Sequence, residues 1–376
     1  MFYFFLFFVS TVLFIHAERA YPTSHRLFYV LSYVAIFWLA FWAGYRDISV
    51  GTDTTFYGVD LFSVASVSEN PIHEAFFDPY KEIEPFFFLL NNFASKIGGI
   101  HMALFFVMLV QLMFAFHGLK YFMSYVPLWI MMLAYVVIFY ILTLNLMRQG
   151  IAVAVGLYAI RFVEQRKLLP LVLTGIFAFF WHNTSVVFFS FLLILYAYRW
   201  NDETTQRIVL AFAIPLSFWA IFSFQDALVF FLGYSEDLMH YASYAGVDTE
   251  HESFLNTIDI VSRIILLIVV GFLHKKETAP ISCFYVLYLV LFVDLASRFL
   301  GVFTAYATRI AYYFVAIEIP YLFWIINSEK LNIQQRNLFV LSLLLLFSFM
   351  TIRENFYFGL NETYPYVFSL LDLTLY

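Results

Sequence analysis

Long apolar runs separated by short polar stretches repeat along the whole chain. A helix that crosses a bilayer needs about 17–25 residues, and most of the runs approach that length. Because they are far longer than the roughly 10-residue strands of a membrane barrel, they predict helices, which satisfy their own backbone hydrogen bonds in lipid. We expect about twelve spans, at residues 2–15, 27–45, 101–119, 126–145, 150–163, 168–181, 184–198, 208–232, 258–274, 281–297, 308–327 and 338–352. The pattern indicates an all-α polytopic membrane protein.

Basic residues mark alternate connections between these spans. When the spans alternate in direction, one side of the membrane receives twelve of the 20 Lys and Arg residues: Arg19, Arg26, Lys120, Arg161, Arg166, Lys167, Arg199, Arg207, Lys275, Lys276, Lys330 and Arg336. Cytoplasmic loops carry an excess of basic residues, so this side is predicted to be cytoplasmic. Both termini are then predicted to be periplasmic.

The predicted periplasmic side carries two long loops, at residues 46–84 and 233–257. They exceed the roughly 2–8 residues that merely join neighbouring helices, and long loops on one face usually carry function. Residues 85–95 are apolar but too short to span, so we expect a peripheral or re-entrant helix at the outer leaflet. If this segment did span, every later loop would change sides. Without an internal repeat, residues 1–376 are predicted to form a single membrane domain.

Composition excludes a water-soluble globule. Apolar residues make up 63% of the chain and charged residues 12%, against about 45–50% and about 25% in soluble proteins. The net charge of −6 is divided between two faces and gives no reason to expect nucleic acid. The lone Cys283 cannot form an internal disulfide. We find no metal-ligand spacing and no phosphate-binding glycine loop, so neither a metal nor a cofactor is predicted.

Arginines dominate the eight basic residues that remain off the cytoplasmic side. An uncompensated charge at full membrane depth costs about 2.5–3.5 kcal/mol, so these side chains need an anionic partner. A guanidinium fork matches phosphate oxygens, which a lipid diphosphate at the outer leaflet would supply. The candidates for binding such a diphosphate are Arg46, Arg148, Arg298 and Arg309.

Internal ion pairing is an alternative for part of this set. Asp294 lies four residues before Arg298, and Asp259 lies four residues before Arg263. Both spacings suit a salt bridge along one helix. Arg148 and Arg309 have no acidic residue within four positions. Their alternative is to reach lipid headgroups with the charged end while the stem stays in the membrane.

Two titratable residues flank apolar segments on the predicted periplasmic side. His182 follows an apolar run, and Glu84 directly precedes residues 85–95. Either side chain could act as a general base for an acceptor hydroxyl. The plainer alternatives are a helix-capping histidine, with Asn183 and Thr184 as capping residues of the next span, and a solvated acid at a helix start.

The loop after the second span combines hydroxyls, a carboxylate and aromatic rings around Gly51. Asp53, Thr54 and Tyr57 are residue types that bind sugar hydroxyls and stack on sugar rings, so with Asn183 they are the candidate glycan-binding residues. A tight turn, in which the Asp53 carboxylate accepts backbone N–H groups, accounts for the same residues equally well.

Several short motifs occur in a fixed order over about residues 45–366. They are Tyr45-Arg46, Gly51-Thr52-Asp53-Thr54 with Tyr57, Glu84-Pro85, Asn145-Leu146-Met147-Arg148-Gln149-Gly150-Ile151-Ala152, Phe180-Trp181-His182-Asn183-Thr184-Ser185, Arg309 with Tyr312, and Tyr364-Pro365-Tyr366. In this order they resemble the EpsG-like polysaccharide polymerases, which include many Wzy-type O-antigen polymerases. The run Phe86-Phe87-Phe88 departs from the family pattern after Glu84-Pro85.

The resemblance implies transfer of a growing glycan from undecaprenyl diphosphate onto a lipid-linked repeat unit, at the outer face of the bacterial inner membrane. Arg148 and the other candidate arginines would stabilise the departing diphosphate, and His182, Glu84 or Asp53 would take the acceptor proton, His182 being favoured. The implied partners are the undecaprenyl-diphosphate-linked oligosaccharide, membrane lipids, a chain-length regulator and the flippase of the same pathway.

Two alternatives involve the same lipid-linked glycans. An O-antigen ligase shares the chemistry and cannot be separated by sequence. A flippase or secondary transporter should contain repeated halves with broken helices and ionisable groups near the midplane, where Glu318 is the clearly deep acid.

Overall fold

The computed structural model describes residues 1–77, 83–199, 202, 204, 250–276, 278–301, 305–328, 330–359 and 361–376. Their contacts divide the chain into two compact units. The first contains Met1–Phe162, Lys167–Phe189 and Leu341–Tyr376, and the second contains Val163–Arg166 and Ser190–Val340. The predicted span 208–232, loop residues 233–249 and the side chain of Tyr57 lie outside the described residues. The expectation of a single domain stays a prediction.

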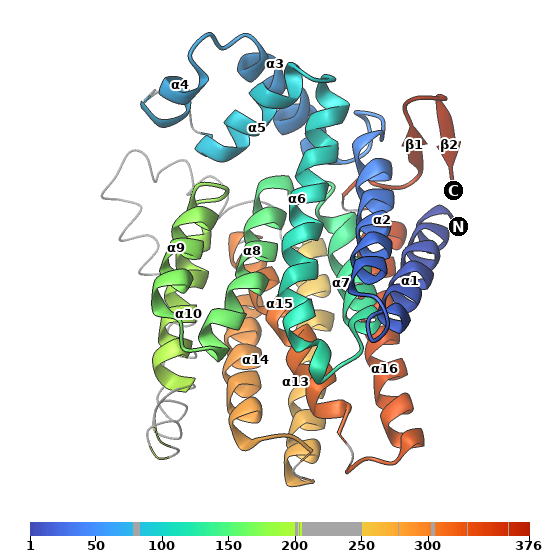
Figure 1. The fold of residues 1–376 in the computed structure, drawn as a ribbon, viewed down its shortest axis with the longest axis vertical. Coiled ribbons are helices and arrows are strands. Elements are labelled where there is room, and N and C mark those ends of the chain that lie inside the picture. Colours follow the sequence, from blue (N-terminus) through green and yellow to red (C-terminus); the bar gives the residue numbers. More distant parts are fainter. Residues whose placement is uncertain are drawn as a thin grey trace. The chain divides into compact units, whose positions relative to one another are not determined.

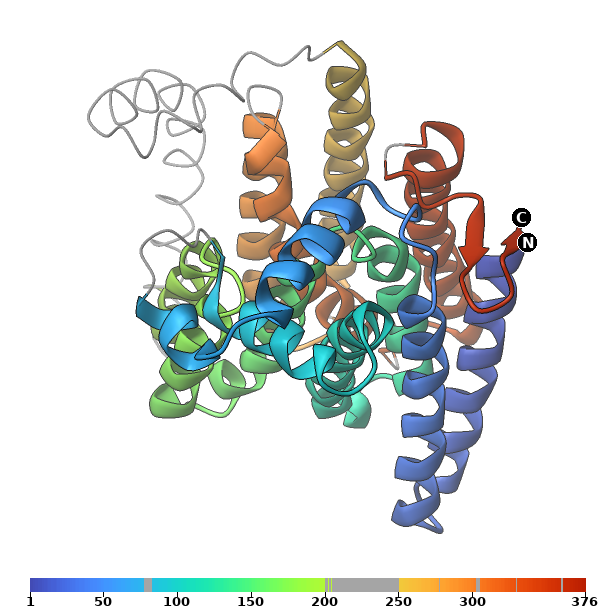
Figure 2. The ribbon, with the colours of Figure 1, turned by 90° about the horizontal axis from the view of Figure 1, so that it is seen from above.

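The first unit is a bundle of apolar helices (Figure 1). In chain order its longer helices are α1 (Phe2–Ala20), α2 (His25–Gly44), α6 (Ile100–Lys120), α7 (Leu128–Leu142), α8 (Met147–Glu164) and α9 (Leu168–Phe179), with the first residues of α10 (Ser185–Arg199) and most of α16 (Ile333–Ile352). Helix α1 packs along α2 and α7, and α2 packs along α6. Figure 2 shows α1 and α2 side by side over their length.

Glycines let some of these helices approach closely. A Cβ atom at Gly44 of α2 would lie 2.6 Å from the Cβ of Phe105 in α6. A Cβ atom at Gly118 of α6 would lie 2.9 Å from the backbone of α8 at Leu157. Small residues at such crossings are typical of membrane helices, where close van der Waals packing replaces the hydrophobic effect as the driving force.

Short helices occupy the long connection between α2 and α6. They are the π-helical segment Thr54–Asp60, α3 (Leu61–Ser66), α4 (Pro71–Phe77) and α5 (Pro85–Ser95). Helix α5 coincides with the apolar segment that the sequence predicts as a short helix, and Pro85 at its first turn suits a helix start. The Asn92 side chain donates to the Ala65 carbonyl at 2.7 Å, which fastens α5 to α3.

The C-terminal segment returns to the start of the chain. After α16 come a π-helical turn (Arg353–Tyr357) and the antiparallel strands β1 (Tyr366–Phe368) and β2 (Leu373–Leu375). The Phe2 amide donates to the Tyr376 carbonyl at 3.0 Å, and the two ends lie together in Figures 1 and 2. Residues 2 and 376 therefore lie at the same end of the first unit.

Among its described residues, the second unit contains three long helices, α13 (Glu250–Lys275), α14 (Ile281–Gly301) and α15 (Ala305–Ile326). Helix α14 packs against both α13 and α15. Pro320 lies inside α15, where it removes one backbone donor, and neighbouring helices make this tolerable in membrane proteins.

Within the described part of the chain, seven helices are long and apolar enough to cross a membrane, and three shorter apolar helices accompany them. Every predicted span that falls in the described residues contains a helix. The protein is thus an all-α polytopic membrane protein with one small hairpin. The total of twelve crossings stays a prediction.

Candidate functional site

Three of the residues singled out by sequence meet in the first unit. Glu84 directly precedes α5, Arg148 is the second residue of α8, and His182 lies between α9 and α10. One carboxylate oxygen of Glu84 lies 2.7 Å from Nδ1 of His182, and the other accepts a hydrogen bond from Nη1 of Arg148. The structure therefore brings two of the three predicted general bases, Glu84 and His182, and one predicted diphosphate ligand, Arg148, into a single cluster.

Local structure fixes the position of Glu84. The residue before a proline is restricted to extended backbone, and Glu84 has φ −62° and ψ 136° ahead of Pro85. The Phe86 amide donates to the Phe180 carbonyl at 3.1 Å, which ties the start of α5 to the end of α9. The Asn183 amide donates to Glu84 Oε1 at 3.4 Å. These bonds hold the carboxylate against the connection that carries His182.

The three side chains of the cluster are largely but not completely shielded. The side chains of Glu84, Arg148 and His182 are 9%, 15% and 18% exposed. Burial raises the pKa of Glu84, but its hydrogen bond with His182 and the charge of Arg148 outweigh burial and leave that pKa below its ordinary value. Glu84 is therefore an ionised carboxylate at neutral pH.

The charge of Glu84 decides the tautomer of its neighbour. An ionised carboxylate only accepts hydrogen bonds, so Nδ1 of His182 must be the donor in this contact. In a neutral imidazole the proton then resides on Nδ1, and Nε2 keeps its lone pair. A carboxylate that orients a histidine in this way leaves the second nitrogen able to accept a proton.

The turn that leads into Arg148 is held by distant parts of the first unit. Asn145 donates through its side-chain amide to both the carbonyl and the side-chain oxygen of Asn361, each at 2.9 Å. Arg46 donates to the Leu144 carbonyl at 2.7 Å. The turn between α7 and α8 thus rests on the loop after α2 and on the C-terminal segment.

Arg46 is engaged by backbone oxygens of its own unit. It is 2% exposed and, besides Leu144, donates to the carbonyls of Ala43 at 2.7 Å and Val50 at 3.3 Å. Burial lowers the pKa of Arg46 to about 10, so the guanidinium stays charged at neutral pH. The contacts observed are those of a residue that shapes the loop, and its predicted diphosphate role stays a prediction.

The four candidate glycan-binding residues do not share one environment. Thr54 is buried and its hydroxyl donates to the Val50 carbonyl at 2.9 Å, whereas Asp53 is half-buried. Asn183 is exposed beside Glu84. Gly51 has a φ of +102°, as the tight turn expected from the sequence requires.

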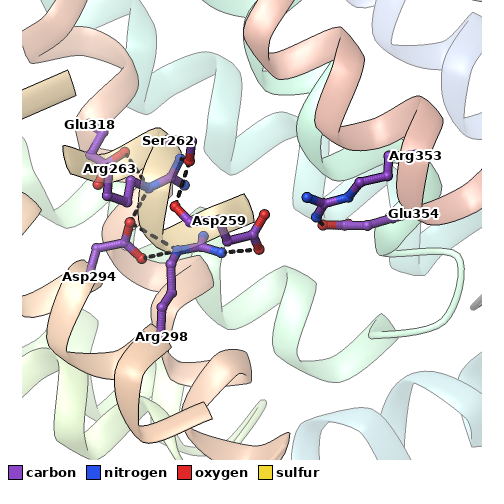
Figure 3. A network of polar contacts seen from close by, with 8 residues as sticks. All are labelled: Asp259, Ser262, Arg263, Asp294, Arg298, Glu318, Arg353 and Glu354. Carbon is purple, nitrogen blue, oxygen red and sulfur yellow. Dashed lines mark hydrogen bonds and ion pairs between the residues drawn. The ribbon is translucent and has the colours of Figure 1, made fainter. Parts of the chain in front are cut away.

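The remaining candidate arginines belong to the second unit. Arg298 is buried on α14 and pairs with Asp294 at 3.0 Å, as the four-residue spacing predicts, and also with Asp259 (Figure 3). Arg263 pairs across helices with Asp294, a contact that spacing along one helix did not reveal. Arg309 is exposed on α15. Diphosphate binding by Arg298 and Arg309 stays a prediction.

One further arginine off the predicted cytoplasmic side is Arg353, to which the sequence assigned no role. It is buried after α16 and pairs with the adjacent Glu354 at 3.1 Å (Figure 3). In the described parts of both units, no three His, Cys, Asp or Glu side chains gather where they could hold a metal ion.

The apolar helices are able to cross a bilayer, and they define a polytopic membrane protein. A shielded carboxylate, imidazole and guanidinium lie together where three of the helix connections meet, and they form an enzyme-like polar cluster. The chain matches the EpsG family over residues 29–368, nearly its whole length, and it belongs to that family. This is the family of Wzy-like polymerases. No curated protein and no solved structure matches the chain.

Proposed function

We propose that the protein is a Wzy-type polysaccharide polymerase that uses undecaprenyl-diphosphate-linked glycans at the outer face of the inner membrane. The observation that carries this proposal is the cluster of Glu84, Arg148 and His182. Family membership supports a membrane glycosyltransferase of the polymerase type. The cluster supplies the two groups that this reaction needs, a base for the acceptor and a cation for the leaving group.

In the proposed reaction, a hydroxyl of the lipid-linked repeat unit attacks the anomeric carbon of the donor glycan. A new glycosidic C–O bond forms while the bond between that carbon and the lipid diphosphate breaks. Nε2 of His182 accepts the hydroxyl proton, because Nδ1 already faces Glu84 at 2.7 Å. The diphosphate leaves with the bonding electron pair.

Arg148 is the proposed partner of the departing diphosphate. Fixed positive charge aimed at developing negative charge is often the largest catalytic contribution in an enzyme. The Arg148 side chain is 15% exposed, and its contact with Glu84 orients the guanidinium. Glu84 in this scheme holds both the base and the cation in place.

The first test is the polysaccharide pattern of a strain that lacks the gene. A polymerase defect leaves one repeat unit and removes long chains. Loss of all surface glycan would instead indicate a flippase or a ligase. Wild-type protein should restore the ladder of chain lengths that long polysaccharides give on a gel, and His182→Gln should not. His25 is an exposed histidine at the start of α2, and His25→Gln should behave as wild type.

The purified enzyme separates the roles of the two candidate bases. His182→Gln should lower turnover by about 10²–10⁴-fold, the usual effect of removing a general base. Glu84→Gln should cost less. Near-native turnover of His182→Gln together with an inactive Glu84→Gln would assign the base to Glu84.

A further inference from the structure

Five ionisable side chains lie buried among the three long helices of the second unit. Asp259 and Arg263 come from α13, Asp294 and Arg298 from α14, and Glu318 from α15 (Figure 3). None of them is more than 4% exposed. All five lie within segments that are long and apolar enough to cross a membrane.

Four of these groups are paired closely. Arg298 lies between two carboxylates, with Nε 3.0 Å from Asp294 Oδ1 and Nη1 bonded to Asp259. The Nε of Arg263 is bonded to the other oxygen of Asp294. Asp294 therefore joins the two guanidinium groups.

Glu318 stands apart from this pattern. It is fully buried and faces Arg263, but its Oε2 lies 3.7 Å from the Arg263 Nε, beyond hydrogen-bond distance. Among the described residues, no N–H or O–H donor reaches either of its carboxyl oxygens. The same Nε atom that bonds Asp294 also faces Glu318, so the two carboxyl groups share one guanidinium.

The charges of the cluster do not balance when every group is ionised. Within these five described groups, three carboxylates face two guanidinium groups, which leaves one negative charge inside a membrane segment. A buried charge without compensation is costly, and a carboxyl group in such a position is normally neutralised. The group to neutralise is Glu318, because each of the other two carboxylates is already bonded to an arginine.

We propose that Glu318 is a proton-binding site, and that the bound proton makes the five-group network electrically neutral. The charged groups facing it among the described residues are Arg263 from α13 and Asp294 and Arg298 from α14. A metal cation fits less well, because two guanidinium groups share the cluster and would repel it. On α15 itself, the hydroxyl of Tyr321 is bonded to Glu164.

Protonation of Glu318 links the packing of the second unit to pH. With the proton bound, the network is neutral and α13, α14 and α15 stay together without a net charge. Loss of the proton leaves one buried negative charge that favours separation of these helices or entry of water. Stability should therefore fall as the pH rises, and Glu318→Gln, a neutral residue of the same shape, should remove that fall.

Infrared spectroscopy of the purified full-length protein tests the proposal directly. A buried carboxylic acid has a carbonyl stretching band that an ionised carboxylate lacks. The wild type should show this band at neutral pH and lose it at alkaline pH, and Glu318→Gln should lack it. Glu164→Gln, which removes a carboxyl group bonded to Tyr321, is the matched control and should keep the band.

Thermal unfolding provides the second measurement. The melting temperature of the wild type should decrease from neutral to alkaline pH, while that of Glu318→Gln should change less. A wild type that never shows the infrared band would overturn the proposal, whether or not the variant folds. If sodium in place of potassium at equal ionic strength raised the melting temperature of the wild type alone, the occupant would be sodium and the proton would be excluded.

Discussion

Among the single residues, Glu84 connects the proposed base, His182, with the proposed diphosphate ligand, Arg148. Its carboxylate contacts a guanidinium on one oxygen and an imidazole on the other. Removing its charge would change the position of Arg148 and the tautomer of His182 together. The three residues act as a unit, so the effects of substituting them should not add.

Replacement of Arg148 by Lys distinguishes recognition of a diphosphate from simple charge balance. Lysine keeps the positive charge but lacks the planar fork of donors that binds two oxygens at once. We expect Arg148→Lys to lose long-chain product while the protein remains folded and inserted in the membrane. Arg26→Lys, at an exposed position on the predicted cytoplasmic side, should keep the full ladder. Normal chain length in Arg148→Lys would contradict the diphosphate role and favour contact with headgroups.

The pH dependence of stability follows from the lowered pKa of Glu84. Its stabilising contribution is complete above the ordinary carboxyl pKa of about 4.3 and is lost as the pH falls through the lowered value. Removing one partner of a buried ion pair costs about 3–5 kcal/mol, and the lower end applies at this partly open site. The melting temperature of Glu84→Gln should therefore lie below that of the wild type at pH 7 and approach it in acid. A constant difference would contradict the linkage.

Sequence identified the three residues of the cluster but not their contacts. Glu84 is separated by 64 residues from Arg148 and by 98 from His182, and no local spacing reveals contacts over such distances. The Arg298–Asp294 pair was predictable because both residues lie on one helix. The contact of Arg263 with Asp294 depends on how α13 packs against α14, which one sequence does not determine.

The C-terminal segment after α16 has a role that the sequence did not predict, because it holds connections between other elements in place. Its β1 strand is bonded to the loop after α2, where the Asp47 amide donates to the Val367 carbonyl at 2.8 Å. Its Asn361 holds the turn before α8 through Asn145. The segment after α16 thus contacts both the loop after α2 and the turn that leads into Arg148.

Asn361→Ala tests this support. The substitution removes the side-chain oxygen that accepts from Asn145 and the amide that donates to Asn355 at 2.8 Å. We expect a loss of about 1–3 kcal/mol of stability and shortened chains, because the turn before Arg148 becomes less constrained. Asn361→Asp keeps the acceptor for Asn145 and should retain most of the polymer length. Equal chain lengths for Asn361→Ala and the wild type would show that the Asn361 side chain is not needed, and that its backbone carbonyl and Arg46 hold the turn adequately.

The apolar pattern predicted the helices well because lipid leaves few alternatives for the backbone. Helix α5 begins and ends at the residues that the apolar segment indicated, with Pro85 at its start. The β1–β2 hairpin was not predicted, because Tyr366–Phe368 and Leu373–Leu375 are too short to show an alternating pattern. The hairpin is defined by its contacts with the loop after α2 rather than by its own sequence.

At the scale of the whole molecule, contacts in the first unit agree with the alternation of basic loops. The Glu18 carboxylate accepts from the Trp129 amide at 3.1 Å, and Lys120 donates to the Tyr29 hydroxyl at 2.6 Å. Each pair joins segments at the same predicted cytoplasmic end. The contacts of Arg46, Asn145 and Asn361 join segments at the predicted periplasmic end. Which end faces the periplasm stays a prediction.

Cysteine labelling in intact cells decides the orientation. Glu69→Cys, at an exposed position in the first long loop, should react with a membrane-impermeant reagent, and Lys167→Cys, exposed between α8 and α9, should not. The single native Cys283 is buried and should give little background. Labelling of Lys167→Cys without Glu69→Cys would invert the topology and move the Arg148 cluster to the cytoplasmic side.

The bond between Asn145 and Asn361 also has a consequence for biosynthesis. The two residues are 216 positions apart, so at about 5–20 residues per second roughly 10–45 s separate their synthesis on the ribosome. During that interval the turn before Arg148 is in the membrane without the partner that fixes it. The turn before Arg148 therefore reaches its final arrangement only after Asn361 has been synthesised, and a chain truncated before Asn361 would be inserted without completing it.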